Sequence, residues 1–133
     1  MAANTEPIFS KNGKIGSVLV TAANTSSQGG GTIGTDIFLA FTADATNGSF
    51  IRQVRFIVTA TTANTASTAT VGRVFISSVT SGATTNANTF MIAEITLPSL
   101  TADSSTAGAS YIDIPLGFPI PASYTILITN HAT

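Results

Sequence analysis

Apolar residues along this chain fall into short runs separated by stretches rich in Thr, Ser, Asn and Gly. The runs are rich in Ile, Val, Phe and Thr, which favour strands, and no helix-length stretch repeats its apolar positions every 3.6 residues. We therefore predict seven or eight strands, with the first run forming either one strand or a pair. They lie in the runs 15–22, 33–43, 50–59, 69–78, 89–97, 111–116 and 123–129.

Two Asn-Gly pairs mark tight turns between these runs. The first, Asn12-Gly13, closes an N-terminal arm that we assign to residues 1–14. The second, Asn47-Gly48, predicts a hairpin between the strand at 33–43 and the strand at 50–59.

The strand at 50–59 carries most of its bulky side chains at even-numbered positions, and we expect that face to be the core face, with Arg52 among them. The stretch 117–121 is too rich in proline for a central strand. Regularly spaced strands without helices predict an all-β fold, an antiparallel β-sandwich or jelly-roll-like single domain over residues 15–133, although a small barrel fits the same pattern.

Composition strengthens this interpretation. The 133 residues include 23 threonines, which can face water on a strand, and only 8% are charged, against roughly a quarter in an ordinary domain. The formal net charge of -1 gives no electrostatic footprint for nucleic acid. Without a signal peptide pattern or about 18 consecutive apolar residues, we expect a chain made in the cytoplasm with no membrane anchor.

Candidates for catalysis are few. The single histidine, His131, could serve in an acid/base pair, but a solvent-exposed tail residue is the simpler interpretation. Glu94 and Asp113 could face each other as a carboxylate pair, or each could point outward or pair with an arginine. We expect no catalytic residues and no enzyme activity.

Metal and cofactor sites are not expected either. Asp36, Asp44 and Asp103 lack a recognisable calcium-ligand spacing. The run 28–31, Gln-Gly-Gly-Gly, lacks the lysine and following helix of a phosphate-binding loop, and we interpret it as a flexible loop.

Arg52 and Arg73 share the parity of the apolar residues in their strands. Each could reach a carboxylate such as Glu94 in or at the rim of the sandwich, or anchor a contact with another protein.

Four segments, in this order and joined by Thr/Ala/Asn-rich loops, resemble small proteins encoded beside the major capsid protein of tailed bacteriophages. They are NGSFIRQVRF at 47–56, ATVGRVFI at 69–76, EITLP at 94–98 and PLGFPIPASY at 115–124. The similarity spans roughly residues 7–130.

This resemblance implies a capsid decoration (cement) protein, a β-sandwich or jelly-roll virion component on the outer capsid surface that binds the major capsid protein, often as a homotrimer. The segments and charges considered above suggest a set of interface residues: Ile8, Phe9, Arg52, Arg73, Tyr111 and Tyr124. The alternative is a head-fibre or tail-associated module that binds a receptor or glycan. Such a module needs aromatic platforms, and the chain has two tyrosines and no tryptophan.

Overall fold

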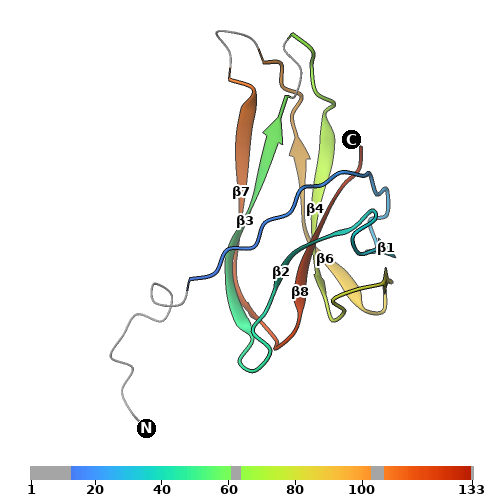
Figure 1. The fold of residues 1–133 in the computed structure, drawn as a ribbon, viewed down its shortest axis with the longest axis vertical. Helices are drawn as coiled ribbons and strands as arrows, with labels where there is room; N and C mark the ends of the chain where they lie inside the picture. Colours follow the sequence, from blue (N-terminus) through green and yellow to red (C-terminus); the bar gives the residue numbers. More distant parts are fainter. Residues whose placement is uncertain (1–12, 61–63, 103–106, 133) are drawn as a thin grey trace.

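The computed structural model describes residues 13–60, 64–102 and 107–132, and it contains strands but no helix in this part of the chain (Figure 1). The all-β prediction is confirmed. The eight strands are β1 (Gly31–Thr32), β2 (Phe38–Thr42), β3 (Ser49–Thr59), β4 (Thr70–Ser77), β5 (Ala83–Thr84), β6 (Thr89–Leu97), β7 (Ala109–Ile120) and β8 (Thr125–Asn130).

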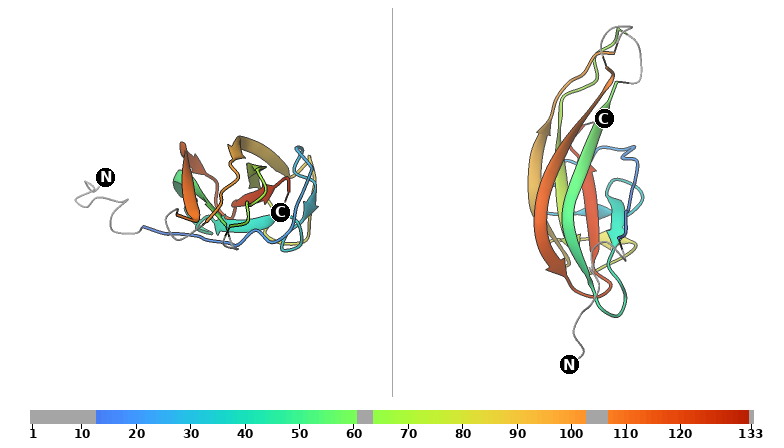
Figure 2. Two further views of the ribbon diagram at one scale, coloured as in Figure 1. Left: turned by 90° about the horizontal axis from the view of Figure 1, so that it is seen from above. Right: turned by 90° about the vertical axis from the view of Figure 1, so that its left-hand side faces the viewer.

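These strands form a sandwich of antiparallel sheets. The larger sheet has the order β2-β8-β4-β6, and β3 pairs with β7 in a two-stranded sheet that packs against it (Figures 1 and 2). The short strands β1 and β5 make a third, small sheet. The chain is therefore a single β-sandwich-like domain, as the sequence predicts.

The main core lies between the two larger sheets. It contains Phe56 of β3, which faces the larger sheet, and Val74, Ile126 and Ile128 of the central strands β4 and β8. Gly72 of β4 leaves room for the Phe56 ring, because a Cβ at position 72 would lie 3.0 Å from that ring. Phe56 thus fixes the spacing between the sheets.

A second apolar cluster covers the opposite face of the larger sheet. Phe75 of β4 and Leu127 of β8 are fully buried there beneath Ile37, with Ile33 packed beside them. The segment between β1 and β2 supplies this cover, which explains why β4 and β8 are apolar on both faces.

The expected first strand is not formed. Residues 15–22 belong to no strand, and the only ladder contact nearby is an isolated bridge from Ala23 to Asn130. The alternating pattern is present and the segment lies close to β2 at Gly16, but it forms no ladder with any described strand.

The expected hairpin between the second and third predicted strands is also wrong. A turn does form at Asn47-Gly48, with a positive φ of 70° at Gly48, but it leads the chain from one sheet into the other. β2 pairs with β8, and β3 pairs with β7. An Asn-Gly pair specifies the turn, whereas burial decides which strands then pair.

The predicted core face of β3 is correct only in part. Val54, Phe56 and Val58 face the core, but Ile51 is buried in place of Phe50. A register shift between Ile51 and Gln53 changes the parity at Arg52. The proline-rich stretch 117–121 mostly continues β7, which fits its place in a two-stranded sheet where every strand is an edge.

Candidate interaction face

Large apolar side chains are exposed in three places. One group, Ile15, Val18 and Leu19, precedes β1, and another, Phe90 and Met91, lies on β6. The third comprises Phe50 and Ile57 of β3 with Tyr111 of β7. It lies on the surface of the β3–β7 sheet that points away from the larger sheet, which we call the outer face.

The outer face is produced by alternation along β7 and, on either side of the register shift, along β3. In β7 the odd-numbered residues from 109 to 119 are exposed and the even-numbered ones are partly buried. Antiparallel pairing sets Ile57 against Tyr111, Arg55 against Asp113, Gln53 against Pro115 and Phe50 against Pro119. Because cross-strand partners point to the same side, these eight residues form one continuous surface.

An arginine holds the middle of this face. Nε of Arg55 donates to Oδ1 of Asp113 at 2.6 Å, and Nη2 donates to Oδ2 at 2.8 Å. The guanidinium also lies over the Tyr111 ring, 4.3 Å from its centroid. Two parallel hydrogen bonds and a stacked ring restrain three side chains that would otherwise move freely.

The hydrogen bonds between Arg55 and Asp113 favour the charged form of both side chains. The hydrogen bond from Arg55 lowers the pKa of Asp113, and the same bond raises the pKa of Arg55. Both groups therefore stay charged at neutral pH. Because both are solvent-exposed, the pair orders the face more than it stabilises the fold.

The outer face has the chemical character of a protein-binding surface. Ile57 is 65% exposed and Tyr111 is 63% exposed. Tyrosine and arginine are enriched among the residues that dominate binding energy at protein interfaces, and a side chain that is ordered beforehand loses less entropy on binding. Pro115 and Pro119 add rigid apolar surface beside them.

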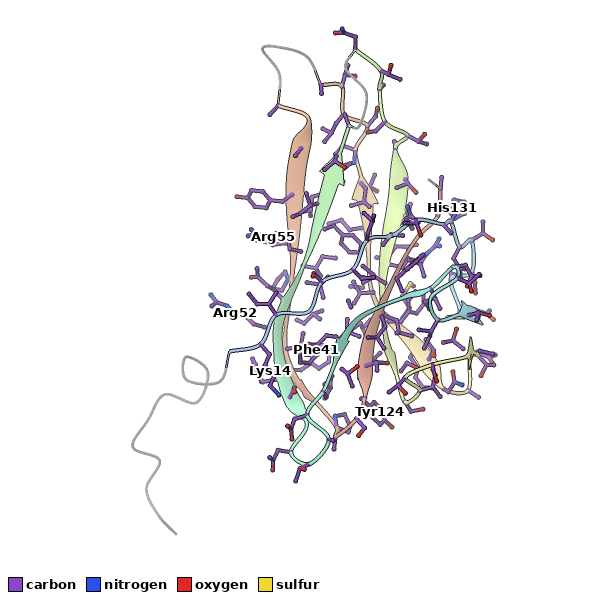
Figure 3. All side chains as sticks on the ribbon, viewed as in Figure 1. Lys14, Phe41, Arg52, Arg55, Tyr124 and His131 are labelled. Carbon is purple, nitrogen blue, oxygen red and sulfur yellow. The ribbon has the colours of Figure 1, made fainter. Side chains whose placement is uncertain are left out.

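Two of the expected interface residues lie on this side of the molecule. Tyr111 is part of the outer face, and Arg52, exposed at the register shift, projects to the same side as Arg55 (Figure 3). Tyr124 lies elsewhere, half-buried against the main core. Ile8 and Phe9 lie outside the described residues.

Arg73 instead forms an internal structural pair. Its side chain is 8% exposed, and Nε donates to Oε1 of Glu94, its cross-strand partner on β6, at 2.8 Å. Nη1 donates to the Asn24 carbonyl at 3.2 Å, and Nη2 lies 3.5 Å from Nδ1 of His131. The first of the two alternatives for this arginine, a pair with Glu94, is the one observed.

Among the described residues, those considered for catalysis and metal binding make contacts with other parts of the fold. Glu94 and Asp113 each bind their own arginine and do not form a facing pair. His131 has an exposed side chain, as expected, but its backbone N–H donates to the Val71 carbonyl. Within the described ranges, no three His, Cys, Asp or Glu residues are placed to hold a metal ion, and Asp103 lies outside them.

Two acidic residues organise turns. The backbone N–H groups of Asn47 and Thr46 donate to Asp44 and lower its pKa, with Lys14 adding a smaller effect. Asp36 accepts a hydrogen bond from the backbone of Thr32 at 2.6 Å.

The loop that contains Gly29, Gly30 and Gly31 is held by hydrogen bonds between its own residues. Nδ2 of Asn24 donates to the Gly30 carbonyl, and Oγ of Ser26 accepts a hydrogen bond from the Gly30 N–H. These two side chains therefore hold the loop in its own conformation.

Sequence reasoning did not identify Phe50, Arg55 and Ile57 as members of a common surface. The alternation of β7 was readable, but the face emerges only when β3 is paired with β7, and the sequence favoured a different partner for β3. The one indication in the sequence was that Arg55 and Ile57 both occupy odd-numbered positions, which places them on the same face of the strand.

Comparison with known protein families, with curated proteins and with solved structures gave no match. In the part of the chain that the structure describes, no helix is long and apolar enough to cross a membrane.

Proposed function

We propose that this chain is a structural virion protein, a capsid decoration protein that binds the outer surface of a phage capsid and stabilises contacts between capsomers. The observation that carries the proposal is the outer face, an exposed surface centred on Arg55 and Tyr111. The resemblance of four segments to decoration proteins supplies the identity of the partner, the major capsid protein.

The physical character of the chain supports a passive binding role. A sandwich with few charges presents an exposed face of apolar and aromatic side chains, whose attachment would rely on apolar burial and hydrogen bonds. The proposal includes no enzyme activity, no cofactor and no nucleic acid partner. The carboxylates considered for catalysis are used to hold arginines in place.

The test is an add-back experiment with capsids that lack the protein. Wild-type protein should bind to saturation, whereas the double variant Ile57→Ser/Tyr111→Ser should bind at least tenfold more weakly, because both substitutions remove exposed apolar contact area. Phe90→Ser is the matched control, since Phe90 is 58% exposed but lies on β6. Equal binding of all three proteins would rule out the outer face as the docking surface.

One observation favours a second candidate, a receptor- or glycan-binding module of a head fibre or tail. Tyr111 is an exposed aromatic ring with charged groups beside it, which is how proteins often hold a sugar. The same variants separate the two functions. Loss of binding to a glycan array with unchanged capsid binding would favour the second candidate.

A further inference from the structure

The segment that precedes β1 carries apolar side chains on both of its faces, but only one of these faces packs against the sandwich. Val20 and Ala22 are partly buried against the main core. The opposite parity carries Ile15, which is 98% exposed, and Leu19, which is 78% exposed. We call residues 13–22 the strap, because it crosses the side of the sandwich where β2 and β3 lie (Figures 1 and 2).

The strap is held in place without backbone pairing. Gly16 lies so close to β2 that a Cβ there would overlap the Ala40 carbonyl oxygen, and the amine of Lys14 lies 3.7 Å from Asp44. Within the described chain, no backbone group of residues 13–22 makes a hydrogen bond, and the first such bond is from Asn24 to Asn130. An extended segment with unpaired backbone groups can accept a neighbouring strand.

On the side away from β7, the part of β3 from Arg52 to Thr59 pairs with no other described strand. β3 is an eleven-residue strand that pairs only with β7 among the described strands. The part from Arg52 to Thr59 contains no proline or lysine, the residues that commonly protect an edge. β7 differs in this respect, because Pro115 and Pro119 interrupt its donors.

A groove lies between these two elements. Strap residues line one wall, and Val54 and Val58 of β3 line another, with Phe41 of β2 nearby. These three side chains are only partly buried although they pack against the core. The sandwich is therefore incompletely covered along the side where the strap and residues Arg52 to Thr59 of β3 lie.

We propose that the strap of one copy pairs with the β3 edge of a second copy of this chain, and that Ile15 and Leu19 are covered by the second copy. The strap is long enough to pair along this whole edge, since its ten residues would extend over about 34 Å and the eight residues from Arg52 to Thr59 over about 27 Å at ~3.4 Å per residue. The contact brings Lys14 of the strap to a segment with two arginines, but Lys14 already pairs with Asp44 and Arg55 already pairs with Asp113.

This contact joins two different surfaces of the same chain, so it is heterologous, and we place it in a closed ring of identical copies because closed symmetry is the rule among soluble homo-oligomers. The inference goes beyond the proposed function, because it leaves the outer face free for the capsid. Failure of this inference would be distinguishable from failure of the proposed capsid binding, since self-association is measured on purified protein without any capsid.

The test is the oligomeric state of the full chain, measured by sedimentation velocity and light scattering. Wild-type protein should form one closed oligomer. Ile15→Asp/Leu19→Asp should raise the dissociation constant by about a hundredfold, because two charges replace buried apolar groups. Phe90→Asp, an exposed apolar position outside the contact, should leave the oligomer intact.

Hydrogen exchange tests the backbone pairing separately. Amides in the strap and along β3 from Arg52 to Thr59 should exchange slowly in the oligomer and rapidly in the double variant, whose folded core should keep its protection. A monomeric wild type, a double variant that stays oligomeric, a control that dissociates, or the absence of this protection difference would each overturn the proposal.

Discussion

At the residue scale, the few charged side chains are used as ordered pairs. Arg55 and Asp113 order the outer face, whereas Arg73 and Glu94 link β4 to β6 and tie both to the loop at Asn24. The two pairs differ in burial, since the Arg73 side chain is almost enclosed and the Arg55 side chain is about half-exposed. They should therefore respond differently to substitution.

The enclosed pair should show strong coupling. Glu94→Ala leaves the buried Arg73 guanidinium without its carboxylate and should lower the free energy of unfolding by about 2 kcal/mol. In an Arg73→Met background, the same change should cost less than about 0.5 kcal/mol, because no buried charge is left unpaired. Urea unfolding of the four proteins measures the coupling, and equal costs in both backgrounds would contradict it.

The exposed pair should respond to pH. Arg55 holds the pKa of Asp113 below its unfolded value of 3.8, so ionisation of Asp113 favours the folded state. This contribution is complete above the unfolded pKa and is lost as pH falls through the lower, folded pKa. The difference in Tm between wild type and Asp113→Asn should therefore be constant near neutral pH and shrink below about pH 4. A difference that grows on acidification would show that the pair does not act in this way.

At the element scale, the sequence predicts strands better than it predicts their partners. Runs at 69–78, 89–97 and 123–129 match β4, β6 and β8 to within about two residues, because Ile, Val, Phe and Thr alternate there between turn residues. β1 and β5 have two residues each, too few to give a periodic signal. The pairing of β3 with β7 joins segments far apart in the chain, and local pattern carries no information on it.

The candidate site likewise combines features that the local sequence predicts with features that only the packing reveals. Tyr111 and Arg52, singled out as one of two tyrosines and as an arginine sharing the parity of apolar neighbours, both lie on the side of the outer face. Tyr124 and Arg73 have the same residue types but are half-buried and buried, and only packing reveals this. The register shift at Arg52, which moves Phe50 to the outer face, has no signature in the alternation itself.

The contact between Phe56 and Gly72 should be decisive for the sandwich. Phe56→Ala removes a ring that spans the two sheets and should lower the free energy of unfolding by about 3–4 kcal/mol. Ile57→Ala is the matched control on the same strand, and it should change stability by less than about 0.5 kcal/mol because its side chain is exposed. Similar losses from both substitutions in thermal or urea unfolding would mean that the assigned faces of β3 are wrong.

At the scale of the whole molecule, low charge determines how the proposed attachment should behave. The eleven charged residues include two arginines already paired with carboxylates of the same chain. Contacts with a capsid would therefore depend on apolar burial and on neutral hydrogen bonds, with many copies on one lattice adding avidity.

Salt should consequently have little effect on attachment. Particles that carry the protein should retain it through a wash in about 1 M NaCl, where the Debye length is ~3 Å, and should lose it in urea or guanidinium. Quantitative electrophoresis of washed particles measures the retained fraction. Release by NaCl alone at neutral pH would point to a charge-driven contact through Arg52 and Arg55.

The most direct test of the central proposal is the number of copies of this protein in purified virions, determined by quantitative mass spectrometry relative to the major capsid protein. A protein that decorates the capsid lattice should be present at a fixed, simple ratio to the capsid protein, reproducible between preparations and unchanged by a salt wash. Its absence from purified particles, a variable trace amount, or a few copies confined to one vertex or the tail would contradict the proposal.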